Sequence, residues 1–474
     1  MLEKVKSILL ILLIMMSLVL TYTLWFGRPP LQEGVVPRYE YAYFTHPLLL
    51  SEIIQPSKIL FYEEENVLHL YRRGDQEYVQ LWDKGLDFLD KRLEMHNAKI
   101  ISKEDVDGLF ETFSSKIVYL FKPYFPLEYL MKTTMFPDLE IERAIILWEE
   151  ESVYVILEGN GNLLFPLSRA EELYAGIIPE GRNPHILLSA SRTLRIPAEE
   201  EPHIPLEEST DDKDIQDIQG IEEEIIVNGS EEDENAKELH NWEIEVSGDI
   251  FIQEADIWAA EVILKKEEIN YEQLVRAFFF DLSMARRIEE RDGALYFTNG
   301  EKGLRIYPSG LLEYAAPRLE RVFSNMSYGT ALQKGAESQS LYGGWLPDMY
   351  LSEAIHFLGG YRFLWSTFHE GLPLEGENTG SEMVINEQGV SYYRRSFHIV
   401  SEEIYERKPF RPYDEAIYRV LSLNREYFIE HPPVLLSMEP VYYRKKTDQA
   451  VPAWAVHFEG LGIVYLHWIT LDPL

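Results

Sequence analysis

The chain has 474 residues, and its 80 acidic and 44 basic side chains give a formal net charge of −36. This charge repels a phosphate backbone and argues against a nucleic-acid partner. Cysteine is absent from the sequence, which excludes disulfides and thiolate chemistry. Hydrophobic residues form 46% of the chain, enough for packed cores, and the length favours about three domains.

An uninterrupted apolar run occupies residues 8–26, between Lys4 and Lys6 on one side and Arg28 on the other. A helix of about 19 residues nearly spans a hydrocarbon layer of ~30 Å, whereas the apolar core of a cleavable signal has only ~7 to 15 residues. The run is therefore predicted to be a single transmembrane helix of the cell membrane. The two lysines favour a cytoplasmic tail at residues 1–7 and an extracytoplasmic body.

Two hydroxyl side chains in this run, Ser17 and Thr21, are four residues apart and so lie on one helical face. Small hydroxyl residues permit close helix approach and hydrogen bonds between helices in a membrane. This face is predicted to bind partner membrane helices. The alternative is that both hydroxyls bond to carbonyls of their own helix and contact only lipid.

A mixed α+β domain is predicted for residues 36–198. Leucines between Leu81 and Leu93 have helical spacing, and alternation of apolar and polar residues elsewhere indicates antiparallel strands. The predicted strands are residues 58–62, 66–71, 116–121, 152–157 and 163–165. Gly159 and Gly161 separate the last two strands, and the turn is expected to hold these glycines at positive φ.

The composition changes at residues 199–238, where acidic runs recur with few aromatic residues. Self-repulsion and low hydrophobicity favour a solvated acidic linker. A calcium-binding or docking role is the alternative, but the segment lacks the Asp-x-Asp-x-Asp-Gly order of an EF-hand loop.

Two further α+β domains are predicted at residues 241–320 and 338–474. The middle domain is expected to contain helices at 256–265 and 271–280 and an antiparallel meander with strands at 294–298, 303–307 and 311–314. The C-terminal domain is expected to contain helices at 351–365 and 414–423 and strands at 382–385, 390–393 and 453–458.

Residues 305–314 and 384–393 share an apolar pair, a glycine turn and a final tyrosine in the same register. Duplicated domains of one topology would produce this echo. Two unrelated hairpins would also produce it, so both interpretations stay open.

Three features occur in a characteristic order: an anchor that ends in Leu24-Trp25, the meander at residues 292–307, and Tyr442-Tyr443-Arg444-Lys445 followed by Pro452-Ala453-Trp454. This order resembles the bacterial YycH regulatory protein family. The last pattern is also similar to the sister family YycI. The acidic stretch at 199–238 is more extended than the family pattern.

The resemblance implies an α+β fold, with a single N-terminal transmembrane helix and three extracytoplasmic domains built on antiparallel sheets, the last two of similar topology. It also implies a regulator that acts with a YycI-like protein on an envelope-sensing histidine kinase of the WalK/YycG type, through contacts between membrane helices. No enzyme activity and no cofactor come with this family.

Catalytic motifs are missing from the sequence. It contains no Gly-x-Ser-x-Gly elbow, Ser-x-x-Lys pair or phosphate-binding loop. The C-terminal histidines lack the HExxH spacing of a metal site, so they are interpreted as surface or core residues and no metal site is predicted. These histidines are His356, His369, His398, His431, His457 and His467, of which His369 with Glu370 is a lone candidate pair. A membrane-tethered cell-wall hydrolase remains an alternative, because a chain this acidic always supplies carboxylate pairs.

A third hypothesis is an extracytoplasmic sensor for a peptide or wall fragment. Tyrosine-rich strands with arginines nearby form amphipathic grooves at many interfaces. The candidate groove residues are Tyr392, Tyr393, Arg394, Tyr442, Tyr443 and Arg444. The alternative is that these aromatic faces pack on the protein's own core.

Overall fold

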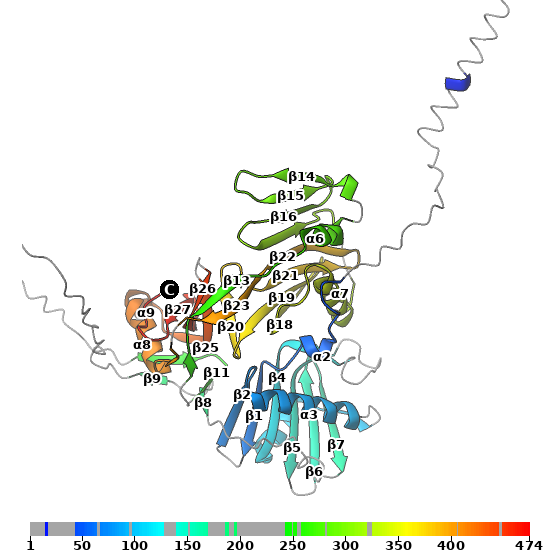
Figure 1. Ribbon diagram of the computed structural model, residues 1–474. Coiled ribbons are helices and arrows are strands. Elements are labelled where there is room, and N and C mark those ends of the chain that lie inside the picture. The colour runs from blue at the N-terminus through cyan, green and yellow to red at the C-terminus, as the bar shows by residue number, and fades with distance from the viewer. Residues whose placement is uncertain are drawn as a thin grey trace, which may run out of the picture. The chain divides into compact units, whose positions relative to one another are not determined.

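The computed structural model describes residues 15–17, 43–63, 67–93, 97–127, 139–149, 152–168, 185–188, 194–196, 242–248, 250–253, 257–279, 282–319, 325–404, 406–444 and 448–474 (Figure 1). The chain divides into two compact units, Met1–Ala42 and Tyr43–Leu474, and the sheets belong to the second. None of the described helices is long and apolar enough to cross a membrane. The predicted span at 8–26 lies outside the described residues except for Met15, Met16 and Ser17, which are helical, and the acidic linker at 199–238 also lies outside them.

The first sheet has seven antiparallel strands in the order β2-β1-β4-β5-β6-β7-β3. They are β1 (Lys58–Glu63), β2 (Val67–Arg72), β3 (Lys99–Ile100), β4 (Ser115–Pro126), β5 (Glu140–Glu149), β6 (Ser152–Gly159) and β7 (Asn162–Ser168). Helices α2 (Leu50–Ile53), α3 (Gln76–Arg92) and α4 (Lys103–Thr112) accompany the sheet. The strands and the leucine-rich helix predicted for this region are confirmed.

Both faces of the first sheet are buried, which explains its nearly continuous apolar runs. Ile59 packs in the cluster that contains Trp82 of α3, whereas its neighbour Leu60 packs in a different cluster that contains Val106 of α4. Adjacent residues of a strand point to opposite faces. The sheet therefore lies between α3 and α4, and Figure 1 shows α3 crossing its strands.

A sheet of 16 strands continues through both regions that were predicted as separate middle and C-terminal domains. Its main path is β14-β15-β16-β17-β22-β21-β19-β20-β25-β26-β13-β23. The strands of its first part are β14 (Arg286–Glu289), β15 (Leu295–Thr298), β16 (Gly303–Ile306), β17 (Leu311–Ala315), β18 (Met349–Phe357), β19 (Gly360–His369), β20 (Leu372–Gly376), β21 (Ser381–Asn386) and β22 (Gly389–Ser396). Helices α6 (Tyr271–Phe278), η3 (Leu282–Met284) and α7 (Tyr328–Leu341) belong to the same stretch of chain.

The meander and its sequence echo are neighbouring hairpins of this sheet. Strand β17 pairs with β22, and Tyr314 lies opposite Tyr393. Both rings contact Phe278 of α6, at centroid distances of 4.7 and 6.1 Å. The repeated tyrosine therefore marks the same buried face in two adjacent hairpins, and backbone hydrogen bonds cross the predicted boundary between residues 320 and 338.

The C-terminal part is built from two separated stretches of chain. Its elements are β8 (His185–Leu188), β9 (Leu194–Ile196), β10 (Trp242–Val246), β11 (Ile250–Gln253), β12 (Trp258–Ala259), β13 (Val262–Lys266), β23 (His398–Glu403), β24 (Lys408–Pro409), α8 (Tyr413–Leu423), α9 (Arg425–Glu430), β25 (Val434–Arg444), β26 (Gln449–Phe458) and β27 (Gly462–His467). Strand β13 pairs with β23 and β26, and β10 pairs with β25. Separate two-stranded sheets join β8 to β11 and β12 to β24.

Two predicted helices are wrong. Residues 256–265 contain β12 and most of β13, and residues 351–365 contain parts of β18 and β19. In the second case Leu351 lies opposite Trp365 in a hairpin, and both side chains are buried. The apolar spacing fits either period over a short run, and pairing of β19 with β21 selects the strand.

The predicted positive φ of Gly159 and Gly161 is also wrong, because neither glycine adopts the left-handed conformation. Gly159 ends β6 beside a bulge in the pairing with β5. A Cβ at Gly159 would lie 1.7 Å from the carbonyl oxygen of Glu140. Close approach of two backbones, rather than turn geometry, is the reason for glycine at this position.

Two glycine turns meet where the first sheet contacts the second. Gly74 follows β2 and has a φ of +98°, and Gly371 joins β19 to β20 with a φ of +79°. A Cβ at Gly371 would lie 1.7 Å from the carbonyl oxygen of Arg73, and one at Gly74 would lie 2.4 Å from the amide nitrogen of Gly371. We call the contact of Arg73 and Gly74 with Glu370 and Gly371 the glycine junction.

The side chain of Arg73 stabilises the glycine junction through buried contacts. It is buried, and its Nη2 donates to the carbonyl of Gln55 at 2.6 Å. The guanidinium carbon lies 4.9 Å from the ring centroid of Tyr350 and 5.1 Å from that of Phe368. Desolvated cation–π contacts of this kind stabilise a structure by about 2 kcal/mol.

Gly371→Ala is expected to destabilise the protein more than Gly462→Ala. Both glycines have positive φ, where an ordinary residue costs about 1–2 kcal/mol, but no atom lies within 4 Å of a Cβ at Gly462. The clash with the carbonyl of Arg73 should add at least about 2 kcal/mol to the loss at Gly371. Chemical denaturation of both variants measures the difference, and equal losses would contradict the close approach.

Candidate functional site

The predicted groove residues on β22 alternate between the two faces of the sheet. Tyr393 is fully buried, and its hydroxyl donates to Gln339 at 3.0 Å. Tyr392 and Arg394 point to the opposite face and are partly exposed. Tyr392 lines a shallow depression of about 340 Å³ together with Tyr296 and Arg305.

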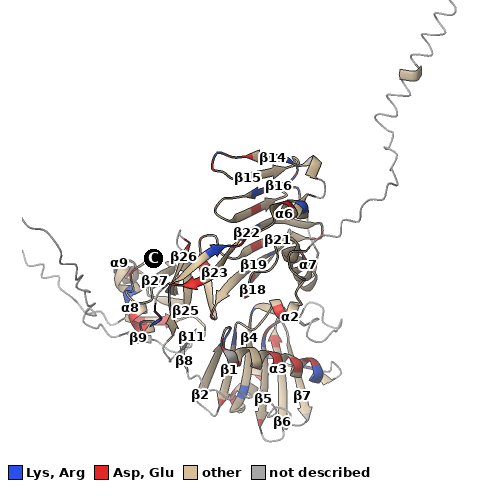
Figure 2. Ribbon diagram, in the orientation of Figure 1, with Lys and Arg blue, Asp and Glu red and all other residues tan. Residues whose placement is uncertain are grey.

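Positive and negative side chains alternate across the face of the sheet that carries Tyr392 and Arg394. Cross-strand register places Arg305 of β16 opposite Glu313 of β17, Glu313 opposite Arg394 of β22, and Arg394 opposite Glu382 of β21. The Nε of Arg362 on β19 continues the row, at 2.7 Å from Glu382. Opposite charges stabilise one another across strands, so the row balances its own charge. Figure 2 shows that neither sign is confined to one sheet.

The predicted groove residues on β25 are mostly internal. Tyr442 is fully buried, and Arg444 is 6% exposed. Tyr443 stacks on Tyr465 with ring centroids 4.2 Å apart. The six candidates therefore do not line a single surface, because Tyr393 and Tyr442 belong to the core.

One turn nevertheless brings the two predicted arginines together. Nη2 of Arg394 donates to the side-chain oxygen of Asn378 at 2.8 Å, and Nη1 of Arg444 donates to the Asn378 carbonyl at 2.8 Å. Asn378 adopts a φ of +56° between β20 and β21. The arginines act there as supports of a turn rather than as the wall of a groove.

Beside Arg444, the imidazole of His398 is buried and held neutral. Its Nδ1 lies 3.0 Å from the Ser396 hydroxyl, and its Nε2 lies 3.3 Å from Nη2 of Arg444. Burial, and then the charges of Arg444 and Lys266, lower the pKa of His398 to about 4, with Asp448 opposing the shift. Folding therefore favours the neutral ring.

A pH-dependent part of the stability is expected from His398. Its folded pKa lies below the unfolded value of 6.5, so this contribution is complete above pH 6.5 and is lost as the pH falls towards 4. The loss should approach about 3 kcal/mol at most. His398→Gln should reduce the difference between the unfolding free energies at pH 7 and pH 4. Substitution of the exposed His431 by Gln should leave that difference unchanged. An identical pH slope in wild type and His398→Gln would contradict this assignment.

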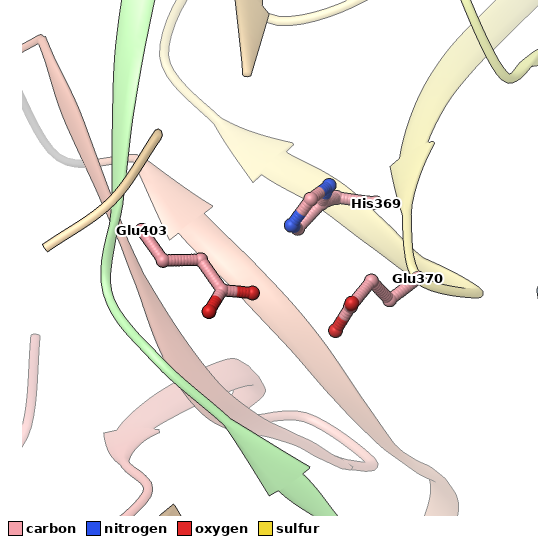
Figure 3. A group of neighbouring side chains, drawn as sticks. All are labelled: His369, Glu370 and Glu403. Carbon is pink, nitrogen blue, oxygen red and sulfur yellow. The ribbon is translucent and has the colours of Figure 1, made fainter. Parts of the chain in front are cut away.

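A second group of side chains gathers at the end of β19. His369 ends that strand, Glu370 follows it in the glycine junction, and Glu403 ends β23 (Figure 3). Each residue offers one ligand atom, and the three atoms lie within 4.8 Å of one another. Glu370 adopts a φ of +50°. We call His369, Glu370 and Glu403 the histidine–glutamate cluster.

Arg407 binds both carboxylates of this cluster. Its Nη2 donates to Glu370 and to Glu403, and its Nε donates to Glu403 at 3.3 Å. The hydrogen bonds from Arg407 hold the pKa of Glu403 below its usual range. The guanidinium therefore supplies the positive charge that two close carboxylates require.

Within the cluster, Nε2 of His369 is buried without a hydrogen-bond partner among the described residues, and the buried Tyr442 hydroxyl beside it lies near the backbone of Ala260. The two rings meet edge to face with centroids 5.3 Å apart. Burial raises the pKa of Tyr442 strongly, and the charges of Glu370 and Glu403 raise it further. Tyr442, predicted as a groove residue, thus lies against His369.

Only part of the histidine–glutamate cluster is visible in the sequence. The pair His369 and Glu370 was visible as neighbours in the chain, but Glu403 and Arg407 were missed. Their approach depends on the register of β23 against β13, which no local pattern reveals. Of the predicted membrane face, Ser17 lies in the short described helical turn, and Thr21 lies outside the described residues.

The comparisons with known proteins agree with this fold. Residues 3–156 match the sequence model described as YycH protein, N-terminal domain. The crystal structure of YycH from Bacillus subtilis aligns with 88% of this chain and 97% of its own, with a TM-score of 0.54 and 13% identity. The N-terminal third of the chain therefore matches the YycH N-terminal domain, and the chain has a YycH-like fold.

Two other solved structures align less well with this chain. An uncharacterized protein from Eubacterium rectale aligns with 49% of the chain and 90% of its own, at a TM-score of 0.35 and 10% identity. The Bacillus megaterium YpeB C-terminal domain aligns with 44% of the chain and 96% of its own, at a TM-score of 0.28 and 12% identity. No curated protein matches the sequence.

Proposed function

We propose that the chain is a membrane-anchored regulator of an envelope-sensing two-component histidine kinase. It acts through transmembrane-helix contacts and extracytoplasmic contacts with a YycI-like partner. The observation that carries this proposal is the match of residues 3–156 to the YycH N-terminal domain, a range that includes the apolar run at 8–26. Regulation by protein contact also fits the absence of catalytic motifs from the sequence.

The apolar run provides the route to the kinase. A helix contact in the membrane contributes about 0.6 to 2 kcal/mol, and ~1.4 kcal/mol shifts an equilibrium tenfold. One or two contacts made by Ser17 and Thr21 are therefore enough to bias a kinase between two states.

The tip of the β18–β19 hairpin provides an extracytoplasmic contact. Ile355, Phe357 and Leu358 are 37%, 39% and 79% exposed, and they follow one another along the chain. The edge of β18 away from β19 pairs with no other described strand. Adjacent exposed apolar side chains mark protein interaction sites, and an unpaired strand edge accepts a partner strand.

Ser17→Leu combined with Thr21→Leu is expected to leave expression intact and to weaken co-purification of the full-length chain with the kinase and the YycI-like protein from membranes. The reason is that the substitution removes the hydroxyls and the close approach on one helical face. Thr23→Leu is the matched control, because it changes the same chemistry on another face. Unchanged co-purification and unchanged kinase output in the double variant would end the proposal for this face.

Phe357→Ser combined with Leu358→Ser is expected to reduce capture of the YycI-like partner at least tenfold without changing the unfolding free energy by more than about 0.5 kcal/mol. The control is Ile429→Ser, which alters an exposed apolar residue on α9. Pull-down with purified partner and denaturation curves measure the two quantities. Equal capture by both variants would exclude the hairpin tip as a contact.

A further inference from the structure

We propose that His369, Glu370 and Glu403 form a binding site for a divalent transition-metal ion, with Zn²⁺ the best match to its donors. The three side chains converge from β19, the glycine junction and β23 (Figure 3). This site goes beyond the regulatory function proposed above and does not depend on it. It also departs from the sequence-based expectation that no metal is bound.

The donor set favours zinc over calcium or magnesium. One imidazole nitrogen and two carboxylate oxygens are ligands that Zn²⁺ accepts, whereas Ca²⁺ and Mg²⁺ prefer oxygen alone. With bonds of about 2.0–2.2 Å, the ligand atoms of a zinc site lie roughly 3–4 Å apart. The separation of up to 4.8 Å must therefore shrink slightly. Both glutamates are partly exposed and have the freedom to move.

An unpartnered polar atom provides an observation that is independent of the carboxylates. Tyr442 is fully buried against His369 with the backbone of Ala260 near its hydroxyl, and Nε2 of His369 meets no hydrogen-bond partner in the described part of the chain. Buried polar groups are normally satisfied, and each exception points to an ion or water. A metal ion takes a nitrogen of His369, and a water on the ion's open position donates to the Tyr442 hydroxyl.

Arg407 explains how the site keeps its charge balanced without an ion. Two carboxylates at this separation repel one another, and the guanidinium bonded to both neutralises them. Its side chain is 42% exposed, so it can turn outward into water. Metal binding is thus an exchange of one cation for another. Zn²⁺ would then tie the glycine junction to β23.

The test uses the full-length chain in detergent, stripped with a chelator and titrated with ZnCl₂ by calorimetry. One Zn²⁺ ion per chain is expected, with a rise in melting temperature. Glu403→Gln should weaken binding at least tenfold, whereas Arg407→Gln should strengthen it several-fold because the competing cation is gone. The matched control is Glu402→Gln, which removes an exposed carboxylate from the adjacent position of β23 and should bind as the wild type does.

His369→Gln provides a second variant, because it keeps both carboxylates and Arg407 and removes only the imidazole. Each variant is first melted in chelator, so that a loss of binding is read only from a chain that unfolds cooperatively. The proposal is overturned if wild type and Arg407→Gln both lack saturable one-to-one binding. Equal weakening by Glu402→Gln and Glu403→Gln would also overturn it, since that result indicates diffuse attraction of zinc to an acidic chain.

Discussion

The contact between the Arg73–Gly74 turn and the Glu370–Gly371 turn constrains how closely the two sheets approach, because it brings backbone directly against backbone. Two backbones meet there with no room for a Cβ on either side. Burial of Arg73 fixes one turn, through the carbonyl of Gln55 and the ring of Tyr350. The same contact sets the conformation of Glu370, so the position of a charged side chain follows from a packing requirement in another sheet.

Local sequence patterns predicted the hairpins well, because period-two alternation and glycine turns are properties of the segments themselves. The runs around Lys58–Glu63 and Gly389–Ser396 are examples, and helices α6 and α8 were also found. Residues 351–365 failed for the opposite reason. Their apolar spacing fits a helix, and only the distant partner strand β21 makes them extended. The division of the chain into sheets likewise depends on pairings such as β17 with β22.

The sequence predicted only those residues of the candidate sites that are neighbours in the chain. Neighbours in the chain, such as His369 and Glu370, are visible in a sequence, but Glu403, Arg407 and Tyr442 reach them through strand register. Alternation along β22 and β25 also separates adjacent groove candidates, since consecutive side chains of a strand face opposite ways. Each of the two tyrosine pairs therefore places one tyrosine in the core, Tyr393 in the first pair and Tyr442 in the second, and the pairs do not line a groove together.

The pairing of β13 with β23 has a consequence for the order of synthesis. Lys266 lies opposite His398, and the amide of Glu267 donates to the carbonyl of Phe397 at 2.7 Å. The chain that leaves β13 therefore returns to the end of β13 at the start of β23. On the ribosome, β13 emerges long before either of its neighbours, β23 and β26. The nascent chain thus carries an incomplete sheet while the intervening hairpins fold, and β23 and β26 complete it only after they have been synthesised.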